Sequence, residues 1–119
     1  MKKYIKKALG NIGEQIAVKY LEKNKYQIIR KNFYCRQGEI DIIAKDKKEI
    51  VFIEVKTRTN TTFGNPAEAV NKLKIKHIYK TANYFLYKVK NPDVFIRFDV
   101  IEILLINGKF NINHIKQII

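Results

Sequence analysis

Hydrophobic positions along the chain follow two spacings, one typical of helices and one typical of strands. Residues 8–24 repeat apolar side chains every three or four positions, so Ala17, Tyr20 and Leu21 fall on one side of a predicted helix. A second helix is predicted over 65–87, with Asn65 as its N-cap and Pro66 at the first helical position. Short apolar or alternating runs predict five strands, at 26–32, 38–45, 49–57, 94–106 and 109–115.

Two turn sequences join neighbouring strands into hairpins. Residues 46–49 (DKKE) form a tight connection between the second and third strands, and Asn107-Gly108 is a strong hairpin signal between the fourth and fifth. The predicted order is α-β-β-β-α-β-β, an α/β fold with a mixed sheet flanked by helices. No repeat or shift in composition divides the 119 residues, so we expect one domain.

The first hairpin brings charged residues together. If strands 38–45 and 49–57 pair symmetrically about their turn, Asp41 lies opposite Glu54. Side chains alternate between the two faces of a strand, so Glu39 and Lys56 should share the face of these two carboxylates. The other face is then expected to be a continuous apolar surface of the core, formed by Ile40, Ile42, Val51, Ile53 and Val55.

Asp41 and Glu54 are candidate ligands of a divalent cation. Directly opposed residues of a hairpin have Cβ atoms about 4.5–5.5 Å apart, so two carboxylates repel there unless a cation lies between them. Mg²⁺ or Mn²⁺ takes such oxygen ligands, and the backbone carbonyl of Val55 is a third candidate. Lys56 would orient or deprotonate a metal-bound water, or stabilise charge on a phosphate. The alternative is an ordinary surface salt bridge between Lys56 and the carboxylates.

The formal charge of +13 indicates an anionic partner, and nucleic acid is the expected class. Lys72, Lys76 and Lys80 form a basic ridge on the second predicted helix, which either follows a phosphate backbone or is a solvated face. Lys74 falls on the apolar side of that helix, where a lysine is unfavourable unless it snorkels to the surface or reaches a carboxylate or phosphate. Arg58 extends the third strand toward a substrate, or belongs to an ordinary polar connection. Only four of the 24 basic residues are arginine, so genome base composition is another source of the lysine excess.

Longer segments of the chain resemble the YraN family of bacterial proteins. The resemblance covers nearly the whole chain and is carried by Gly10, Gly13 and Glu14, and by residues 38–44 (GEIDIIA), 51–58 (VFIEVKTR), 65–74 (NPAEAVNKLK) and 97–100 (RFDV). It implies a PD-(D/E)xK restriction-endonuclease-like core, similar to that of archaeal Holliday-junction resolvases. It also implies that Asp41 and Glu54 are metal ligands, that Lys56 is catalytic, and that the helix residue Glu14 contacts the metal, directly or through water. The similarity to resolvases suggests a homodimer.

We therefore expect a Mg²⁺- or Mn²⁺-dependent endonuclease that acts on DNA, including branched or otherwise structured DNA. A non-catalytic nucleic-acid-binding protein that retains the nuclease fold is the main alternative. A small interaction subunit with a basic face is a third. The chain has one cysteine, Cys35, no apolar run near the roughly 18 residues of a membrane span, and no signal-peptide pattern, so we expect a cytoplasmic location without membrane association.

Overall fold

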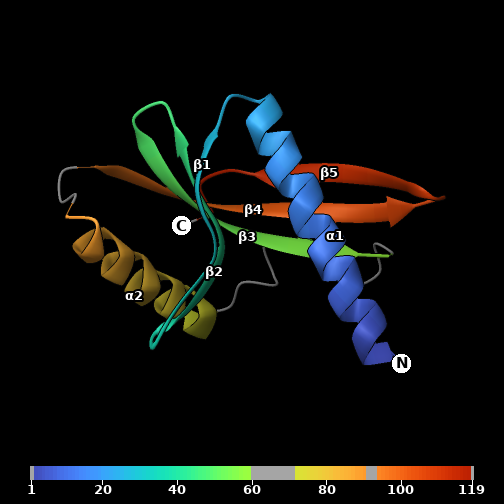
Figure 1. The fold of residues 1–119 in the computed structure, drawn as a ribbon, viewed down its shortest axis with the longest axis horizontal. Coiled ribbons are helices and arrows are strands. Elements are labelled where there is room, and N and C mark those ends of the chain that lie inside the picture. Colours follow the sequence, from blue (N-terminus) through green and yellow to red (C-terminus); the bar gives the residue numbers. More distant parts are fainter. Residues whose placement is uncertain (1, 60–71, 91–93, 119) are drawn as a thin grey trace.

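The computed structural model describes residues 2–59, 72–90 and 94–118. Within these residues, two helices and five strands follow the predicted order (Figure 1). Their bounds are α1 Lys2–Lys23, β1 Gln27–Cys35, β2 Gly38–Asp46, β3 Glu49–Arg58, α2 Lys72–Lys88, β4 Phe95–Ile106 and β5 Lys109–Ile115. No helix of the described residues has the length and hydrophobicity needed to cross a lipid bilayer.

The predicted element boundaries are mostly confirmed. Strands β2 to β5 begin and end within one residue of the predicted strands. The prediction was wrong at two ends. Helix α1 begins at Lys2 rather than Ala8, because the preceding segment is rich in lysine, a good helix former. Strand β1 continues to Cys35 past Asn32, which takes a left-handed φ of 51° that asparagine tolerates better than most residues. The predicted helix start at 65–71 lies outside the described residues.

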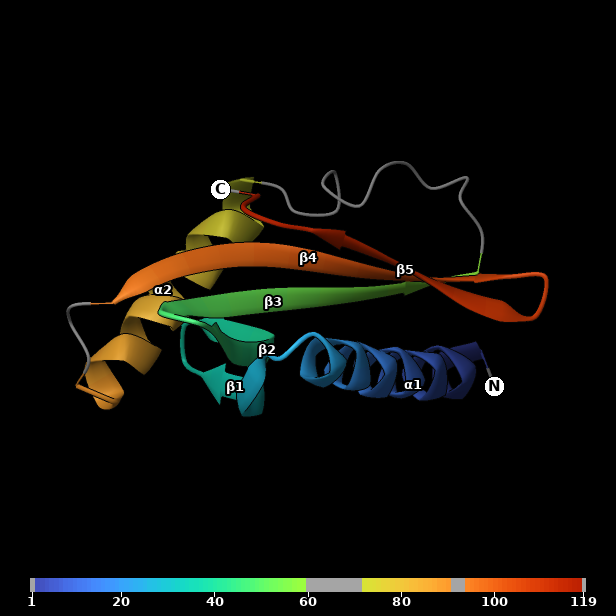
Figure 2. The same cartoon turned by 90° about the horizontal axis from the view of Figure 1, so that it is seen from above.

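The five strands form one mixed sheet in the order β1-β2-β3-β4-β5. Only β3 and β4 are parallel neighbours, and they are joined through α2, whereas the other neighbours are antiparallel. Helix α1 crosses β3, β4 and β5 in Figure 1. Figure 2 shows α1 toward the end of the molecule that holds the β4–β5 hairpin, and α2 toward the opposite end. The two helices also cover different faces of the sheet, since their residues belong to separate core clusters.

Successive residues of β3 pack against different helices. Val51 and Ile53 belong to a core cluster with Ala17 and Leu21 of α1. Phe52 belongs to a second cluster, with residues of α2. The predicted apolar face is therefore confirmed for Ile42, Val51, Ile53 and Val55, which all belong to the α1 cluster or pack against it. The face that carries the charged residues is also buried over this part of β3, because Phe52 packs there against α2.

The predicted register of the β2–β3 hairpin is confirmed as far as the pair Ile42–Ile53. The next predicted pair, Asp41–Glu54, is not part of the ladder. Ile40 packs in the α2 cluster whereas Ile42 packs in the α1 cluster, so the alternation of faces along β2 breaks across Asp41. The apolar set that was predicted to include Ile40 is corrected accordingly.

A buried ion network joins the far ends of the chain. Arg97 donates to both carboxylate oxygens of Asp99, at 2.9 and 3.0 Å, and to the Tyr26 hydroxyl at 2.8 Å. His114 Nε2 donates to Asp99 Oδ2 at 2.7 Å and accepts at Nδ1 from Tyr20 at 2.9 Å. Because these residues lie on α1, β4, β5 and the segment before β1, the network fixes the helix and the C-terminal hairpin to the sheet.

Helix α1 approaches β3 most closely at Gly13. A Cβ atom built on Gly13 would lie 1.8 Å from Thr57 Oγ1 and 3.0 Å from Thr57 Cβ, so no larger side chain fits without movement. Gly10, one turn earlier, has no neighbour within 4 Å of the same position. Close packing at Gly13 also sets the position of the next residue, Glu14.

Asp99→Asn should lower the free energy of unfolding by on the order of 3 kcal/mol, because it leaves the buried Arg97 charge without its main counterion. Asp46→Asn is the matched control, since Asp46 contacts the same guanidinium at 3.1 Å but is more exposed. The control should cost less than about 1 kcal/mol. Urea denaturation of both variants measures the difference, and equal losses would contradict this account of the network.

The Asp99 network should also make stability depend on acid pH. Burial pushes the pKa of Asp99 up, but the hydrogen bonds from His114, Arg97 and the Gln117 amide outweigh burial and hold this pKa below its ordinary value of 3.8. The stabilisation is therefore complete above about that pH and is lost as the pH falls through the lower folded value. Asp99→Asn should remove this part of the acid dependence.

Gly13→Ala should destabilise the fold by about 1–3 kcal/mol, because the new methyl group overlaps Thr57 and pushes α1 off the sheet. Gly10→Ala should instead stabilise it by about 0.5–1 kcal/mol, since alanine is the better helix former and open space surrounds the site. Thermal denaturation of the two variants beside the parent measures both signs. A shared sign would mean that contact with Thr57 does not decide the outcome.

Candidate active site

Strand β2 leaves β3 at Asp41. Beyond the Ile42–Ile53 pair, β3 continues to pair with β4, at Glu54–Val100 and Val55–Ile101. The Val55 N–H donates to Asp41 Oδ2 at 2.8 Å. The Asp41 carboxylate thus accepts the hydrogen bond that a main-chain carbonyl of β2 would accept in a continued ladder. This hydrogen bond holds Asp41 beside β3, the strand that carries Glu54 and Lys56.

Glu54 is held between two lysines. Lys74 of α2 donates to Glu54 Oε1 at 2.6 Å, and Lys56 Nζ lies 3.5 Å from the same oxygen. Of the alternatives for Lys74, the structure therefore shows contact with a carboxylate, that of Glu54. The Glu54 side chain is 13% exposed and the two lysine side chains about 32–33%. The site thus combines partial burial with a close cluster of opposite charges.

The two lysines differ in their proton affinity. Burial lowers the pKa of Lys56, and its contact with Lys74 lowers this pKa further, against the opposing charge of Glu54. Burial also acts to lower the pKa of Lys74, but the hydrogen bond to Glu54 outweighs it and the net shift is upward. Lys56 is therefore the member of the pair that gives up its proton more readily, as a general base must.

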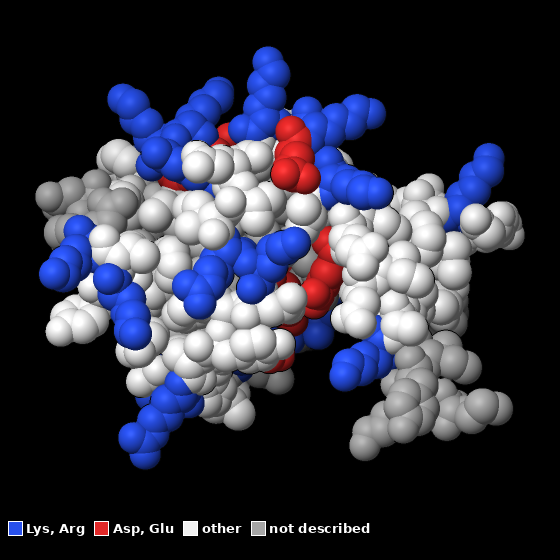
Figure 3. All heavy atoms as spheres, in the orientation of Figure 1, with Lys and Arg blue, Asp and Glu red and all other residues white. Residues whose placement is uncertain are grey.

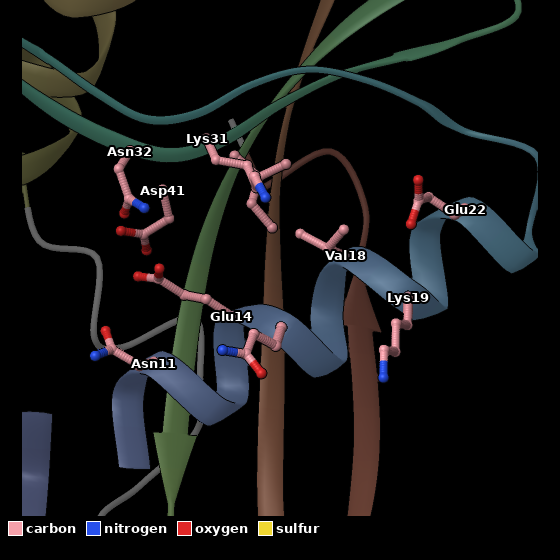
Figure 4. Close-up of a pocket in the computed structure, with 10 residues that line it drawn as sticks. Asn11, Glu14, Val18, Lys19, Glu22, Lys31, Asn32 and Asp41 are labelled. Atoms are coloured by element: carbon pink, nitrogen blue, oxygen red, sulfur yellow. The ribbon is translucent and has the colours of Figure 1, made fainter. Parts of the chain in front are cut away.

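Burial and neighbouring carboxylates destabilise the charged forms of Asp41 and Glu14. Burial, followed by the charge of Glu54, raises the pKa of Asp41 to about 7, and Glu14 and Glu39 contribute in the same direction. Burial raises the pKa of Glu14 as well, against a hydrogen bond with Asn32. Figure 4 shows the Glu14 and Asp41 carboxylates turned toward each other, with Asn32 beside them. Such a cluster favours a bound cation.

A furrow of about 570 Å³ opens from Asp41 between α1 and the β1–β2 strands. Figure 3 shows acidic side chains along a groove on this face, bordered by lysine and arginine side chains. Glu14 and Asn32 lie at the Asp41 end of the furrow, and Glu22 lies at the far end (Figure 4). The complete lining is Asn11, Glu14, Gln15, Val18, Lys19, Glu22, Lys31, Asn32, Asp41 and Ile42.

The side chains at this site are hard oxygen donors, the type that Mg²⁺ and Mn²⁺ prefer. Within residues 2–59, 72–90 and 94–118, no three His, Cys, Asp or Glu side chains are close enough together to hold a metal ion. Mg²⁺ needs only one or two protein carboxylates when waters and substrate phosphates supply the remaining ligands. Asp41 and Glu54 are two carboxylates of the type that such a site needs.

The residues expected to contact nucleic acid are not gathered in one place. Arg58 lies 3.3 Å from Glu102, with only 15% of its side chain exposed, and Lys74 is engaged by Glu54. Lys76 and Lys80 are exposed on α2, as a phosphate-binding ridge or a solvated face would be. Lys72 begins α2, and its side chain is not among the parts described.

Sequence reasoning did not identify the furrow residues Lys19, Lys31, Asn11, Gln15 and Asn32. These residues come from α1 and β1, which meet only after the helix has docked on the sheet. An asparagine in a left-handed conformation within a strand is unusual, but nothing in the residues around Asn32 marks that conformation in advance.

Comparison with known proteins agrees with the motifs on these strands. A protein of Caldicellulosiruptor bescii, called UPF0102 protein, is 51% identical over 113 residues, which cover 94% of each chain. A UPF0102 protein of Clostridium botulinum strain 657 is 48% identical over 117 residues, covering 96% of this chain and 95% of the relative. The sequence pattern described as "Uncharacterised protein family UPF0102" matches residues 13–103, which include Glu14, Asp41, Glu54 and Lys56. The chain therefore belongs to the UPF0102 family, which is the YraN family that its motifs indicated.

Proposed function

We propose that this protein is a Mg²⁺- or Mn²⁺-dependent endonuclease that hydrolyses phosphodiester bonds in DNA, with branched or otherwise structured DNA as its substrate. The observation that carries the proposal is the meeting of Asp41, Glu54 and Lys56 where β2 leaves β3. Two half-buried carboxylates and a lysine with a lowered pKa are the groups that metal-assisted phosphodiester hydrolysis requires. The same role for these positions is implied by the likeness to nucleases of the PD-(D/E)xK type.

Each residue has a distinct task in this proposal. Asp41 and Glu54 hold the cation, with the Val55 carbonyl as a further ligand and Glu14 in contact directly or through water. When bound, the cation lowers the pKa of a water ligand and neutralises charge on the phosphate. Lys56 orients the attacking water and accepts its proton, or stabilises the charge that develops on the phosphate. Lys74 holds Glu54 in place from α2.

The chain's charge of +13 supports a polyanionic substrate. Lys76 and Lys80 are exposed on α2, the helix that also contributes Lys74 to the site. A non-catalytic nucleic-acid-binding role is the second candidate. Two observations favour it. Lys56 and Lys74 both contact the Glu54 carboxylate, and the described residues hold no group of three close metal-binding side chains.

Asp41→Asn and Glu54→Gln should each weaken Mn²⁺ binding by on the order of 10-fold or more, because each removes a charged oxygen ligand. Glu22→Gln is the matched control, since Glu22 is an exposed carboxylate at the far end of the same furrow (Figure 4). Calorimetric titration with Mn²⁺ measures all three. If both site variants bind the ion like the parent, these carboxylates are not its ligands.

Lys56→Ala should reduce single-turnover cleavage of DNA by on the order of 10²-fold, while DNA affinity changes little. The double variant Lys76→Ala/Lys80→Ala should do the reverse. If both lysines contact phosphates, the slope of log K against log[salt] should fall by about 0.9 for each. Lys45→Ala, at an exposed lysine of β2, is the control for general loss of charge.

The same pair of measurements separates catalysis from binding. A Lys56→Ala protein that cuts as fast as the parent would overturn the catalytic role of this lysine. If no metal supports cleavage by the parent and the double variant still flattens the salt slope, the non-catalytic role replaces the nuclease. An unchanged salt slope would identify the α2 ridge as a solvated face.

A further inference from the structure

The furrow beside Asp41 has the size of a site for one small ligand. Its volume of about 570 Å³ lies within the roughly 300–1,000 Å³ typical of small-molecule pockets. One nucleotide, with its base and sugar, fits such a space, whereas the two strands of a continuous duplex do not. A substrate strand that enters the furrow must therefore leave its partner there.

The lining of the furrow suits a nucleobase. Asn11 and Gln15 contribute side-chain amides, each of which can both donate and accept hydrogen bonds, whereas the Asn32 amide is engaged by Glu14. Val18 adds apolar surface to the furrow. A base has apolar faces and an edge of donors and acceptors, and in a duplex that edge is taken up by its partner base. The amides therefore match a base whose pairing edge is free.

Two lysines flank this lining from opposite sides. Lys19 comes from α1 and Lys31 from β1 (Figure 4), and both are exposed. Neither is in a salt bridge within the part of the chain that the structure describes. They differ in this from Lys56 and Lys74, which contact Glu54. Lys19 and Lys31 are thus available for the phosphates on either side of a bound nucleotide.

We propose that the furrow binds one unpaired nucleotide of the substrate, next to the bond that is cut. This rests on the proposed nuclease function, because Asp41 lies at one end of the furrow and would hold the cation there. The preferred substrate is then DNA in which a strand leaves the duplex at the cleavage site, as at a bulge, flap or branch. Asn11 and Gln15 determine this preference by hydrogen bonds to the free base edge.

The test compares three duplexes that differ at one position: fully paired, with a single-nucleotide bulge, and with the same bulge carrying an abasic nucleotide. The abasic probe keeps the distorted backbone and removes only the base. Binding is measured by fluorescence anisotropy in EDTA, and again in Mg²⁺ with the Lys56→Ala protein. The bulge with a base should bind on the order of 10-fold more tightly than the other two probes, the effect expected of a good amide–base contact.

Two kinds of variant locate the base. Gln15→Ala removes an amide, and Val18→Phe fills the furrow, so each should abolish the preference while leaving affinity for the paired duplex unchanged. Asn113→Ala is the matched control, since Asn113 is an exposed amide on β5 outside the furrow, and it should keep the preference. Thermal denaturation checks that each variant is folded. If Val18→Phe does not fold, the result for Gln15→Ala is used alone.

The outcomes separate this inference from the nuclease proposal. Equal binding of the three probes by the parent, or a preference that survives Gln15→Ala, would overturn the inference while cleavage remains possible. A base-dependent preference that these variants abolish supports it, even if no metal then supports cleavage and the nuclease proposal falls. Failure to bind any of the probes would overturn both.

Discussion

The separation of β2 from β3 at Asp41 is the constraint on which the rest of the site depends. Up to the Ile42–Ile53 pair the hairpin is regular, and beyond it β3 stays with β4 while β2 diverges. The Val55 N–H would lose its partner in a half-buried position, and the Asp41 carboxylate supplies one. The same divergence sends Ile40 and Ile42 to different cores. A backbone requirement thus places a carboxylate beside Glu54.

The two helices complete the site from opposite faces of the sheet. Helix α1 docks through Gly13 on Thr57, which brings Glu14 toward Asp41 and closes one wall of the furrow. Helix α2 sends Lys74 to Glu54. The catalytic candidates therefore lie between two cores rather than on a solvated face of the hairpin, and this burial perturbs their proton affinities. A surface salt bridge would not produce shifts of this kind.

Charge is divided between separate structural tasks. Arg97 contacts Asp99 and Tyr26, and it also contacts Asp46 and Glu49 at the ends of β2 and β3. These contacts connect the strands with the segment that follows α1. Arg58 is likewise engaged by Glu102. A large part of the remaining positive charge is carried by exposed lysines. Their flexible side chains can contact phosphates without a fixed geometry. The count of 24 basic residues therefore overstates how many are free to meet a substrate.

Local patterns in the sequence determined the order of the elements, most of their ends, and the register of the β2–β3 hairpin as far as the Ile42–Ile53 pair, because each depends on neighbouring residues and turn geometry. They also predicted that Asp41, Glu54 and Lys56 lie close together, although through a direct Asp41–Glu54 pair that the sheet does not form. The position of Lys74 in its helix indicated that it either snorkels or meets an anionic partner. Only the tertiary structure decided that Glu54 is that partner, that both sheet faces are buried, and that a furrow lined by Asn11 and Lys31 opens beside Asp41. These features arise where segments distant in sequence pack together. The spacing of hydrophobic residues within one segment does not indicate which helix covers which face of the sheet.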